Sequence, residues 1–192
     1  MTVRRREHTD TMSRIEETVR YIDLARVTVP IHEFTADERS ALDDVNHRVA
    51  SGQSLSDVMD FVFESTLELF PCDRLSISFV QEDDRVVSHW TRALYSPVIL
   101  QPGYAEDLRQ STLARVRDTG HVRIIDDLEA YLAAKGSSSS TRLLVREGVR
   151  SSMTCPLSVE GRNVGFLFRS SREPNAYGMH EVLLHSALAE RL

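Results

Sequence analysis

Hydrophobic and polar residues alternate along two neighbouring segments near the C-terminus, residues 149–158 and 164–169. Alternation with a period of two places one kind of side chain on each face of a strand, so it predicts two strands. The linker at 160–162 is short and contains a glycine, which favours an antiparallel hairpin. Pro156 has no backbone N–H to donate, so we expect an edge, a bulge or the end of regular pairing there.

A second strand pair is predicted further upstream. Residues 75–80 and 85–93 show the strand pattern, and the polar residues 81–84 form the turn between them. A short apolar run at 122–125 predicts one more strand. The stretch 94–107 contains two prolines and a glycine without a clear period, so we expect a long loop, which in a compact domain is usually functional or mobile.

Helical spacing of apolar residues, or residues typical of helix ends, marks the rest of the chain. Thr35 and Glu38 have the spacing of a capping box, which predicts a helix that ends near Gly52. Residues 55–70 show the strongest amphipathic pattern in the chain, and Pro71 ends it. Further helices are predicted at 10–29, 111–119, 128–135, 141–147 and 179–192.

The predicted N-terminal helix has a heptad-like seam. The positions that follow at steps of three and four, for little more than two heptads, are Met12, Ile15, Val19, Ile22, Arg26 and Val29. Two interpretations stay open: the helix packs on its own domain, or it is a dimer-forming arm. We therefore divide the chain into an N-terminal extension or signalling helix, residues 1–34, and one domain, residues 35–192. The last helix has no stop signal, so we expect it to lead toward an effector outside this sequence.

The order of these elements predicts an α+β fold with a central antiparallel β-sheet. The N-terminal and C-terminal helices are amphipathic, so we expect them to cover one face of the sheet. The irregular middle of the chain then covers the other face with loops and short helices. Such an arrangement leaves a pocket between sheet and loops, where small ligands tend to bind.

Composition narrows the class of protein. The 192 residues are 41% hydrophobic and 27% charged, as in soluble globular proteins. The net charge of -6 argues against a nucleic-acid-binding protein, which needs a basic face. We find no apolar run of about 20 residues and no secretory signal, so we expect no membrane span and a cytoplasmic location. Two cysteines are too few for a disulfide framework.

Several segments together resemble the GAF domain, a small-molecule sensory module of bacterial signalling proteins. They are residues 54–70, 74–81, 112–127 and 148–190, including the stretches TLARVRDTGHVRIIDD and EGVRSSMTCPLSVEGRNVGFLFRSS. The resemblance covers roughly residues 38–191. It implies a ligand pocket on one face of the sheet and a homodimer formed through the terminal helices. It also implies a downstream effector, such as a histidine kinase of a two-component system or a cyclic-dinucleotide enzyme.

Candidate chemistry is sparse. GAF domains that attach a bilin covalently resemble one another in a cysteine followed by histidine, whereas Cys155 is followed by proline and Cys72 by aspartate. We interpret Cys155 as a buried apolar residue. No spacing of cysteines and histidines fits a zinc site, and no catalytic arrangement can be argued, so we expect no metal and no enzyme. The cofactor, if any, stays unidentified.

The predicted ligand site combines the polar face of the sheet with aromatic residues from a strand and the loops. Its members are Ser76, Ser78, Trp90, Tyr95, Tyr104, Tyr131, Ser152 and Thr154. A group of arginines is expected at the rim, either in surface salt bridges or to select an anionic ligand: Arg92, Arg123, Arg142, Arg146 and Arg150. His89 and His121 are the candidates for an axial haem ligand.

Our leading hypothesis is a regulatory sensor domain. A small molecule enters between the sheet and residues 95–142, orders the loops and biases the terminal helices of a dimer, which signal to the effector. One alternative is a ligand-free domain that only dimerises and spaces other domains. The other is a sensor that binds haem or another chromophore non-covalently.

Overall fold

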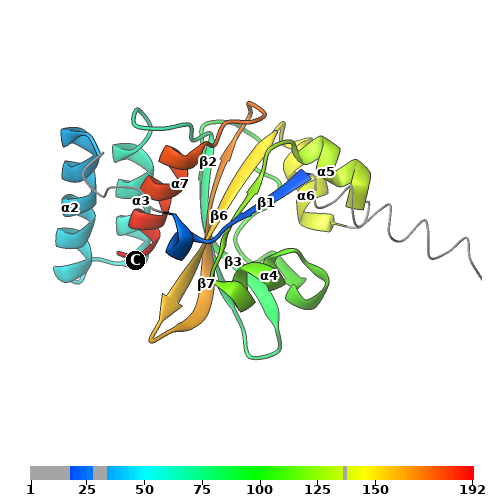
Figure 1. Cartoon of the computed structure of the whole chain (residues 1–192), viewed down its shortest axis with the longest axis horizontal. Helices are drawn as coiled ribbons and strands as arrows, with labels where there is room; N and C mark the ends of the chain where they lie inside the picture. The colour runs from blue at the N-terminus through cyan, green and yellow to red at the C-terminus, as the bar shows by residue number, and fades with distance from the viewer. Residues whose placement is uncertain (1–17, 28–33, 136–137) are drawn as a thin grey trace, which may run out of the picture.

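The computed structural model describes residues 18–27, 34–135 and 138–192. These residues form a seven-stranded antiparallel sheet with the order β1-β5-β6-β7-β2-β3-β4, and helices cover both faces (Figure 1). The predicted α+β class with a central antiparallel sheet is confirmed. The strands are β1 (Val19–Ile22), β2 (Arg74–Val80), β3 (Arg85–Ala93), β4 (Ala105–Asp107), β5 (Val122–Ile125), β6 (Ser151–Val159) and β7 (Arg162–Ser171).

The hairpin β6–β7 forms as the alternation predicts. Glu160 and Gly161 both have positive φ, 51° and 75°, which is the sign that a two-residue turn needs to match the twist of the strands. Pro156 lies beyond the last residue of β6 that pairs with β5, Thr154, and next to an irregularity after Leu157. The proline therefore lies where β6 has a partner on one side only, as expected.

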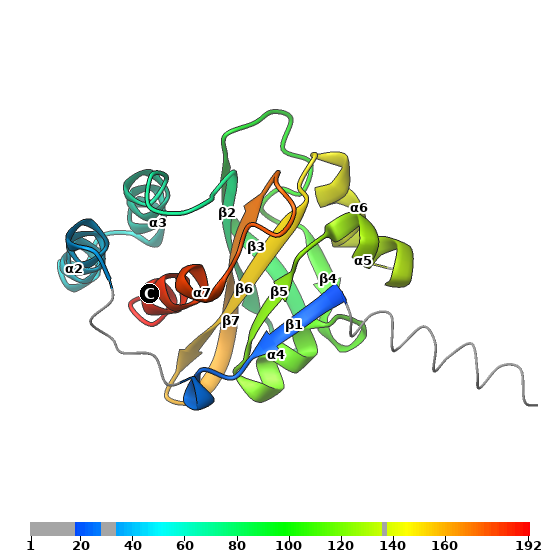
Figure 2. The same cartoon turned by 45° about the horizontal axis from the view of Figure 1, so that its top comes forward.

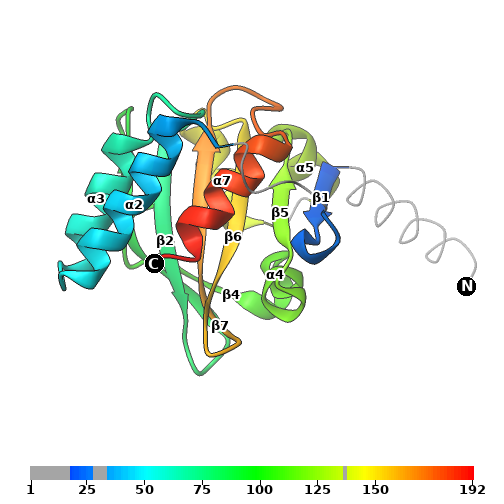
Figure 3. The ribbon, with the colours of Figure 1, turned by 60° about the vertical axis from the view of Figure 1, so that its left-hand side comes forward.

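Three helices cover one face of the sheet. They are α2 (Ala36–Ala50), α3 (Leu55–Ser65) and α7 (Met179–Ala189), and Figure 3 looks onto this side. The capping box predicted at the start of α2 is present, because Thr35 accepts from the Glu38 amide and the Glu38 carboxylate accepts from the Thr35 amide. The largest buried cluster lies between these helices and the inward residues of β2, β6 and β7.

The opposite face is covered by the middle of the chain. We call this layer the cover: residues 94–119, with β4, the 3-10 helix η3 (Leu108–Gln110) and α4 (Leu113–Thr119), together with α5 (Leu128–Lys135) and α6 (Ser139–Arg146). Figure 2 shows α2, α3 and α7 on one side of the sheet and α4, α5 and α6 on the other. In the described part of the chain, every helix is too short or too polar to cross a lipid bilayer.

The helix predicted at 10–29 is wrong over residues 19–27. Those residues form β1 and the 3-10 helix η1 (Leu24–Arg26), and β1 pairs antiparallel with β5. Arg20 fixes this edge strand with two bonds of 2.6 Å to the Asp126 carboxylate. The rest of that predicted helix, residues 10–18 and 28–29, is outside the described residues except for Thr18. The division at residue 34 stays a prediction.

Two smaller boundaries also differ. The helix predicted at 55–70 ends at Ser65, and the hydroxyl of the next residue, Thr66, donates to the carbonyl of Val62 at 2.6 Å. The loop predicted at 94–107 ends in the short strand β4, which pairs with the start of β3. The strand β4 depends on pairing with a separate segment of the chain, which local sequence pattern does not show.

Candidate functional site

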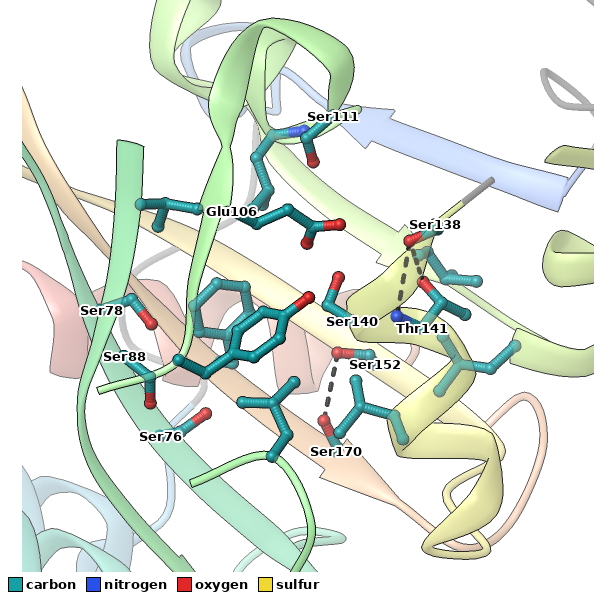
Figure 4. Close-up of a pocket in the computed structure, with 18 of the residues that line it drawn as sticks. Ser76, Ser78, Ser88, Glu106, Ser111, Ser138, Ser140, Thr141, Ser152 and Ser170 are labelled. Atoms are coloured by element: carbon teal, nitrogen blue, oxygen red, sulfur yellow. Dashed lines mark hydrogen bonds between the residues drawn. The ribbon is translucent and has the colours of Figure 1, made fainter. Parts of the chain in front are cut away.

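The cavity floor is made of small polar residues on one face of the sheet. Strand alternation places Ser76 and Ser78 of β2, Ser152 of β6 and Ser170 of β7 on this face, whereas their neighbours Ile77 and Met153 face the helices. Ser170 donates a hydrogen bond to Ser152, with 3.1 Å between the oxygens. Ser88 of β3 completes this serine floor, and Figure 4 shows the five side chains around one hollow.

The cover closes this hollow to a cavity of about 70 Å³. The cover contributes Leu100, Tyr104, Glu106, Ser111, Leu113, Leu128, Tyr131, Ser140, Thr141 and Leu144, and Ser138, the N-cap residue of α6, lies beside them. The rest of the described lining comes from strands: the serine floor with Arg74, Val86, Arg123, Ile125 and Phe168. The sheet side is therefore mainly polar, with three apolar residues, and the cover side is mixed.

Arg74 joins the cavity wall to the loop after β3. It is 2% exposed, and its burial lowers the pKa of the guanidinium. Glu147 is its counter-charge, with 3.5 Å between Nε and Oε2, and Arg74 Nη2 donates to the Leu100 carbonyl at 2.6 Å. Glu147 also accepts from the amides of Ile99 and Leu100 and from the Tyr95 hydroxyl, at 2.6–2.7 Å. This pair fixes one end of the cover to the sheet.

Arg123 of β5 is the second buried cation on the wall, and its partners are hydroxyl groups. Nη1 donates to Thr112 Oγ1 at 2.7 Å and Nη2 to Thr154 Oγ1 at 3.0 Å. Burial lowers the pKa of this guanidinium, and the phenols of Tyr131 and Tyr21 oppose the effect. Unlike Arg74, this side chain has no carboxylate in ion-pair contact within the described residues.

Five of the eight predicted site residues line the cavity: Ser76, Ser78, Tyr104, Tyr131 and Ser152. The other three, Trp90, Tyr95 and Thr154, are not among its lining residues. Whether the five bind a ligand stays a prediction.

Each of the three outlying residues has a physical reason for its position. A bulge pairs Ile77 with Trp90 but Ser78 with Ser88, so His89 is an extra residue and Trp90 packs against the helix-side cluster. The Tyr95 hydroxyl donates a hydrogen bond to the Glu147 carboxylate. Thr154 is on the correct face, but it is fully buried under the Arg123 side chain that donates to it.

Most of the histidines and arginines predicted as haem ligands or rim residues lie outside the cavity lining. His89 packs edge-on against Phe79, with 5.3 Å between ring centroids, and His121 lies 3.6 Å from Asp23; neither lines the cavity. Arg92 pairs with Asp60 and Glu64 of α3, on the helix side. Of the five predicted rim arginines, only Arg123 belongs to the lining; the other four are Arg92, Arg142, Arg146 and Arg150.

The lining includes residues that sequence reasoning missed. Arg74 has the same strand parity as Ser76 and Ser78 on β2, so alternation held the signal for it. Ser88 and Ser170 face the cavity because they pair with Ser78 and Arg74 of β2, and that pairing is not visible in the local pattern. Glu106 and the residues of α6 come from stretches without a clear period, where no such signal exists. Both cysteines, Cys72 and Cys155, are buried in the helix-side cluster, away from the cavity.

A family model described as "GAF domain" matches residues 52–192. A comparison with curated proteins found no match. The fold is similar to the phycocyanobilin-bound GAF domain from a cyanobacterial phytochrome, with 16% identity, a TM-score of 0.63 and coverage of 82% of this chain and 92% of that chain. It is also similar to the GAF domain from Acinetobacter phosphoenolpyruvate-protein phosphotransferase, with 13% identity, a TM-score of 0.63 and coverage of 82% and 91%.

A third similar structure is the chromophore-binding domain of an unusual bacteriophytochrome, RpBphP3 from R. palustris, with 11% identity and a TM-score of 0.61; the match covers 80% of this chain and 59% of that chain. At these identities the structural likeness shows the fold alone. The family model, however, spans most of the sequence, from just before α3 to the last residue of the chain. The chain therefore belongs to the GAF domain family.

Proposed function

We propose that this protein is a regulatory sensor domain that binds a small molecule in the cavity between the serine floor and the cover. The observation that supports it most directly is the polar lining itself: hydroxyl groups from four strands and from α6 converge on one partly open cavity (Figure 4). Ligand sites in proteins combine such a cavity with a few convergent polar groups. The role is sensory rather than catalytic, as is general for GAF domains.

The size of the cavity favours a compact ligand. A volume of about 70 Å³ accommodates roughly five water molecules, if about one probe sphere of free volume is needed for each. Sites for larger organic ligands usually measure on the order of 300–1,000 Å³. The structure named for bound phycocyanobilin shares the fold, but here no histidine lines the cavity within the described residues. These observations favour a small metabolite over haem or another chromophore.

We propose that the signal passes through the sheet. Ser152 and Ser170 face the cavity, while the residues beside them, Met153 and Arg169, are buried under the helices on the other face. Arg169 donates to Thr66 at the end of α3, with 2.7 Å between the atoms. A ligand that favours one spacing of β6 and β7 thereby favours one position of the helices, in proportion to its differential affinity for the two states.

The output that we propose is a homodimer that signals through its terminal helices to an effector, such as a histidine kinase or a cyclic-dinucleotide enzyme. The domain then acts in the cytoplasm as part of a two-component or related system. On the helix side, His180 of α7 and Glu38 of α2 are 2.7 Å apart, and this contact joins the two helices.

Native mass spectrometry of the purified chain tests this function, because it reports the mass of the dimer and of any retained ligand together. Ser140 of α6 lines the cavity, whereas its neighbour Ser139 is exposed and does not. We expect Ser140→Phe to fill the cavity and lose the ligand, and the matched control Ser139→Phe to retain it. A chain that binds nothing from a metabolite extract, yet forms dimers, is instead the ligand-free spacer.

A further inference from the structure

Two opposite charges on the cavity wall lack an ion-pair partner within the described residues. The first is Arg123, which is 7% exposed and is held by the hydroxyls of Thr112 and Thr154. Its Nε is buried and makes no hydrogen bond. Burying a cation beside neutral hydroxyls alone is unfavourable, so an anionic group in the cavity would stabilise it.

The second is Glu106 of β4, which lies on the cover side. Its carboxylate points into the space between the serine floor and α6 (Figure 4), and no described residue donates a hydrogen bond to it or pairs with it. The remaining charge of the described lining, Arg74, is already balanced by Glu147. The cavity therefore presents one uncompensated cation and one uncompensated carboxylate.

The charges of Arg123 and Glu106 interact electrostatically, although the two side chains form no ion pair. The carboxylate of Glu106 is near enough to raise the pKa of Arg123, although burial has the larger and opposite effect. The two residues line the same cavity. A ligand that separates them can thus contact both, with an anionic group at Arg123 and a cationic group at Glu106.

We propose that the cavity is a site for a small zwitterion of the amino-acid type, bound by its carboxylate to Arg123 and by its ammonium group to Glu106. The inference rests on the proposed sensory function and names the ligand class. A ligand with a carboxylate alone would pair with Arg123 and leave Glu106 without a partner. A ligand with an amine alone would pair with Glu106 and leave Arg123 without a partner. Both lose a charge-assisted bond that the zwitterion makes. The volume of about 70 Å³ and the serine floor suit a compact, polar molecule of this kind.

Calorimetric titration of the full chain with the standard L-amino acids tests the inference. For the amino acid that binds best, we expect its N-acetyl derivative, which lacks the ammonium group, and its carboxamide, which lacks the carboxylate, to bind roughly ten- to a hundredfold more weakly. These ligand changes leave the protein intact, so the result does not depend on a variant that folds.

Charge variants assign each end of the ligand. Glu106→Gln should bind the amino acid and its N-acetyl derivative about equally, and Arg123→Gln should lose the preference for the free carboxylate over the carboxamide. Arg92→Gln is the control for a lost arginine, because Arg92 lies on the helix side of the sheet with Asp60 and Glu64. Glu129→Gln is the control for a lost carboxylate; Glu129 lies 3.4 Å from Arg150, outside the described lining.

Two results would overturn the inference. One is that no amino acid binds; the other is that the derivatives bind as well as the free amino acid. If native mass spectrometry then finds a ligand of another class that Ser140→Phe removes and Ser139→Phe retains, the sensory function stands and only the ligand class is wrong. If no ligand of any class depends on the cavity, the proposed function fails as well.

Discussion

Buried charged side chains are placed on both faces of the sheet, and each is stabilised in a different way. Arg74 has a carboxylate, Glu147, at 3.5 Å. Arg123 has two threonine hydroxyls. Arg169, on the helix side, donates to Thr66 and lies over the Phe70 ring, 3.7 Å from its centroid. The carboxylate of Glu147 thus stabilises two regions at once, because it pairs with Arg74 and accepts hydrogen bonds from the first part of the cover.

We predict that Glu147→Gln lowers the free energy of unfolding by about 3 kcal/mol or more, because it leaves the Arg74 charge buried without its partner. Urea denaturation measures this loss. Glu129→Gln is the matched control, because Glu129 is 57% exposed in its side chain and pairs with Arg150 at the surface. The control should change stability by less than about 0.5 kcal/mol. Equal effects of the two variants would contradict the assigned role.

The cysteine thiols should be unreactive in the folded protein. Burial raises the pKa of Cys155 to about 12, although the hydroxyl of Ser186 opposes this effect, and burial also raises the pKa of Cys72. Since the thiolate is the reactive form, alkylation with iodoacetamide at neutral pH should be slow until denaturant unfolds the chain. Rapid labelling of either cysteine under native conditions would show that the helix-side cluster opens readily.

We predict that the Glu38 carboxylate makes a contribution to folding stability that depends on pH. Burial raises the pKa of this carboxyl, but hydrogen bonds from Thr35 and the contact with His180 outweigh burial and hold it below its ordinary value. A lowered pKa means that the contribution is present above the unfolded pKa, about 4.3, and is lost as the pH falls through the folded value. The stability difference between the wild type and Glu38→Gln should therefore be present above about pH 5 and shrink below about pH 4. A stability difference that grows as the pH falls would contradict the lowered pKa of Glu38.

At the scale of elements, the hairpin β6–β7 and strand β2 approach each other unusually closely at Gly165. A Cβ on this residue would lie 2.4 Å from the Ser78 carbonyl oxygen, and the φ of Gly165 is not positive, so the constraint is space and not backbone conformation. Since Ser78 belongs to the serine floor, this contact also fixes part of the cavity.

We predict that Gly165→Ala costs about 1–3 kcal/mol of folding free energy through overpacking. Gly178→Ala is a suitable comparison, because its added Cβ would meet only the end of the Glu181 side chain, at 3.1 Å, which can move away. Thermal or urea unfolding of both variants measures the difference. The interpretation is wrong if the two substitutions cost the same.

Local pattern identified the elements whose cause is local. The capping box at Thr35, the turn at Gly161 and the alternation of β6 are set by neighbouring residues, and the structure confirms each. Strand β1 is different: steps of three between Val19 and Ile22 fit a helix, yet pairing with β5 decides the conformation. The bulge at Ile77 is equally non-local and turns Trp90 away from the cavity. Sequence pattern alone holds no information on either pairing.

At the scale of the whole molecule, the sheet separates a helix layer with an apolar core from a cover with a polar cavity (Figures 1 and 2). This two-sided plan followed from the sequence, because amphipathic helices flank the strands and an irregular middle remains. The residues that line the cavity could be predicted from the sequence only in part, since Glu106, Ser138 and Ser140 come from that irregular middle. A ligand that bridges floor and cover should stabilise both layers by mass action.

The central claim is that this cavity binds the ligand, and the most direct test is the dissociation constant of the retained ligand for three proteins. We predict that the wild type and Ser139→Phe bind with equal affinity and that Ser140→Phe binds at least about tenfold more weakly, a loss of about 1.4 kcal/mol. Equal affinity of Ser140→Phe and the wild type, with all three proteins folded, would contradict the claim.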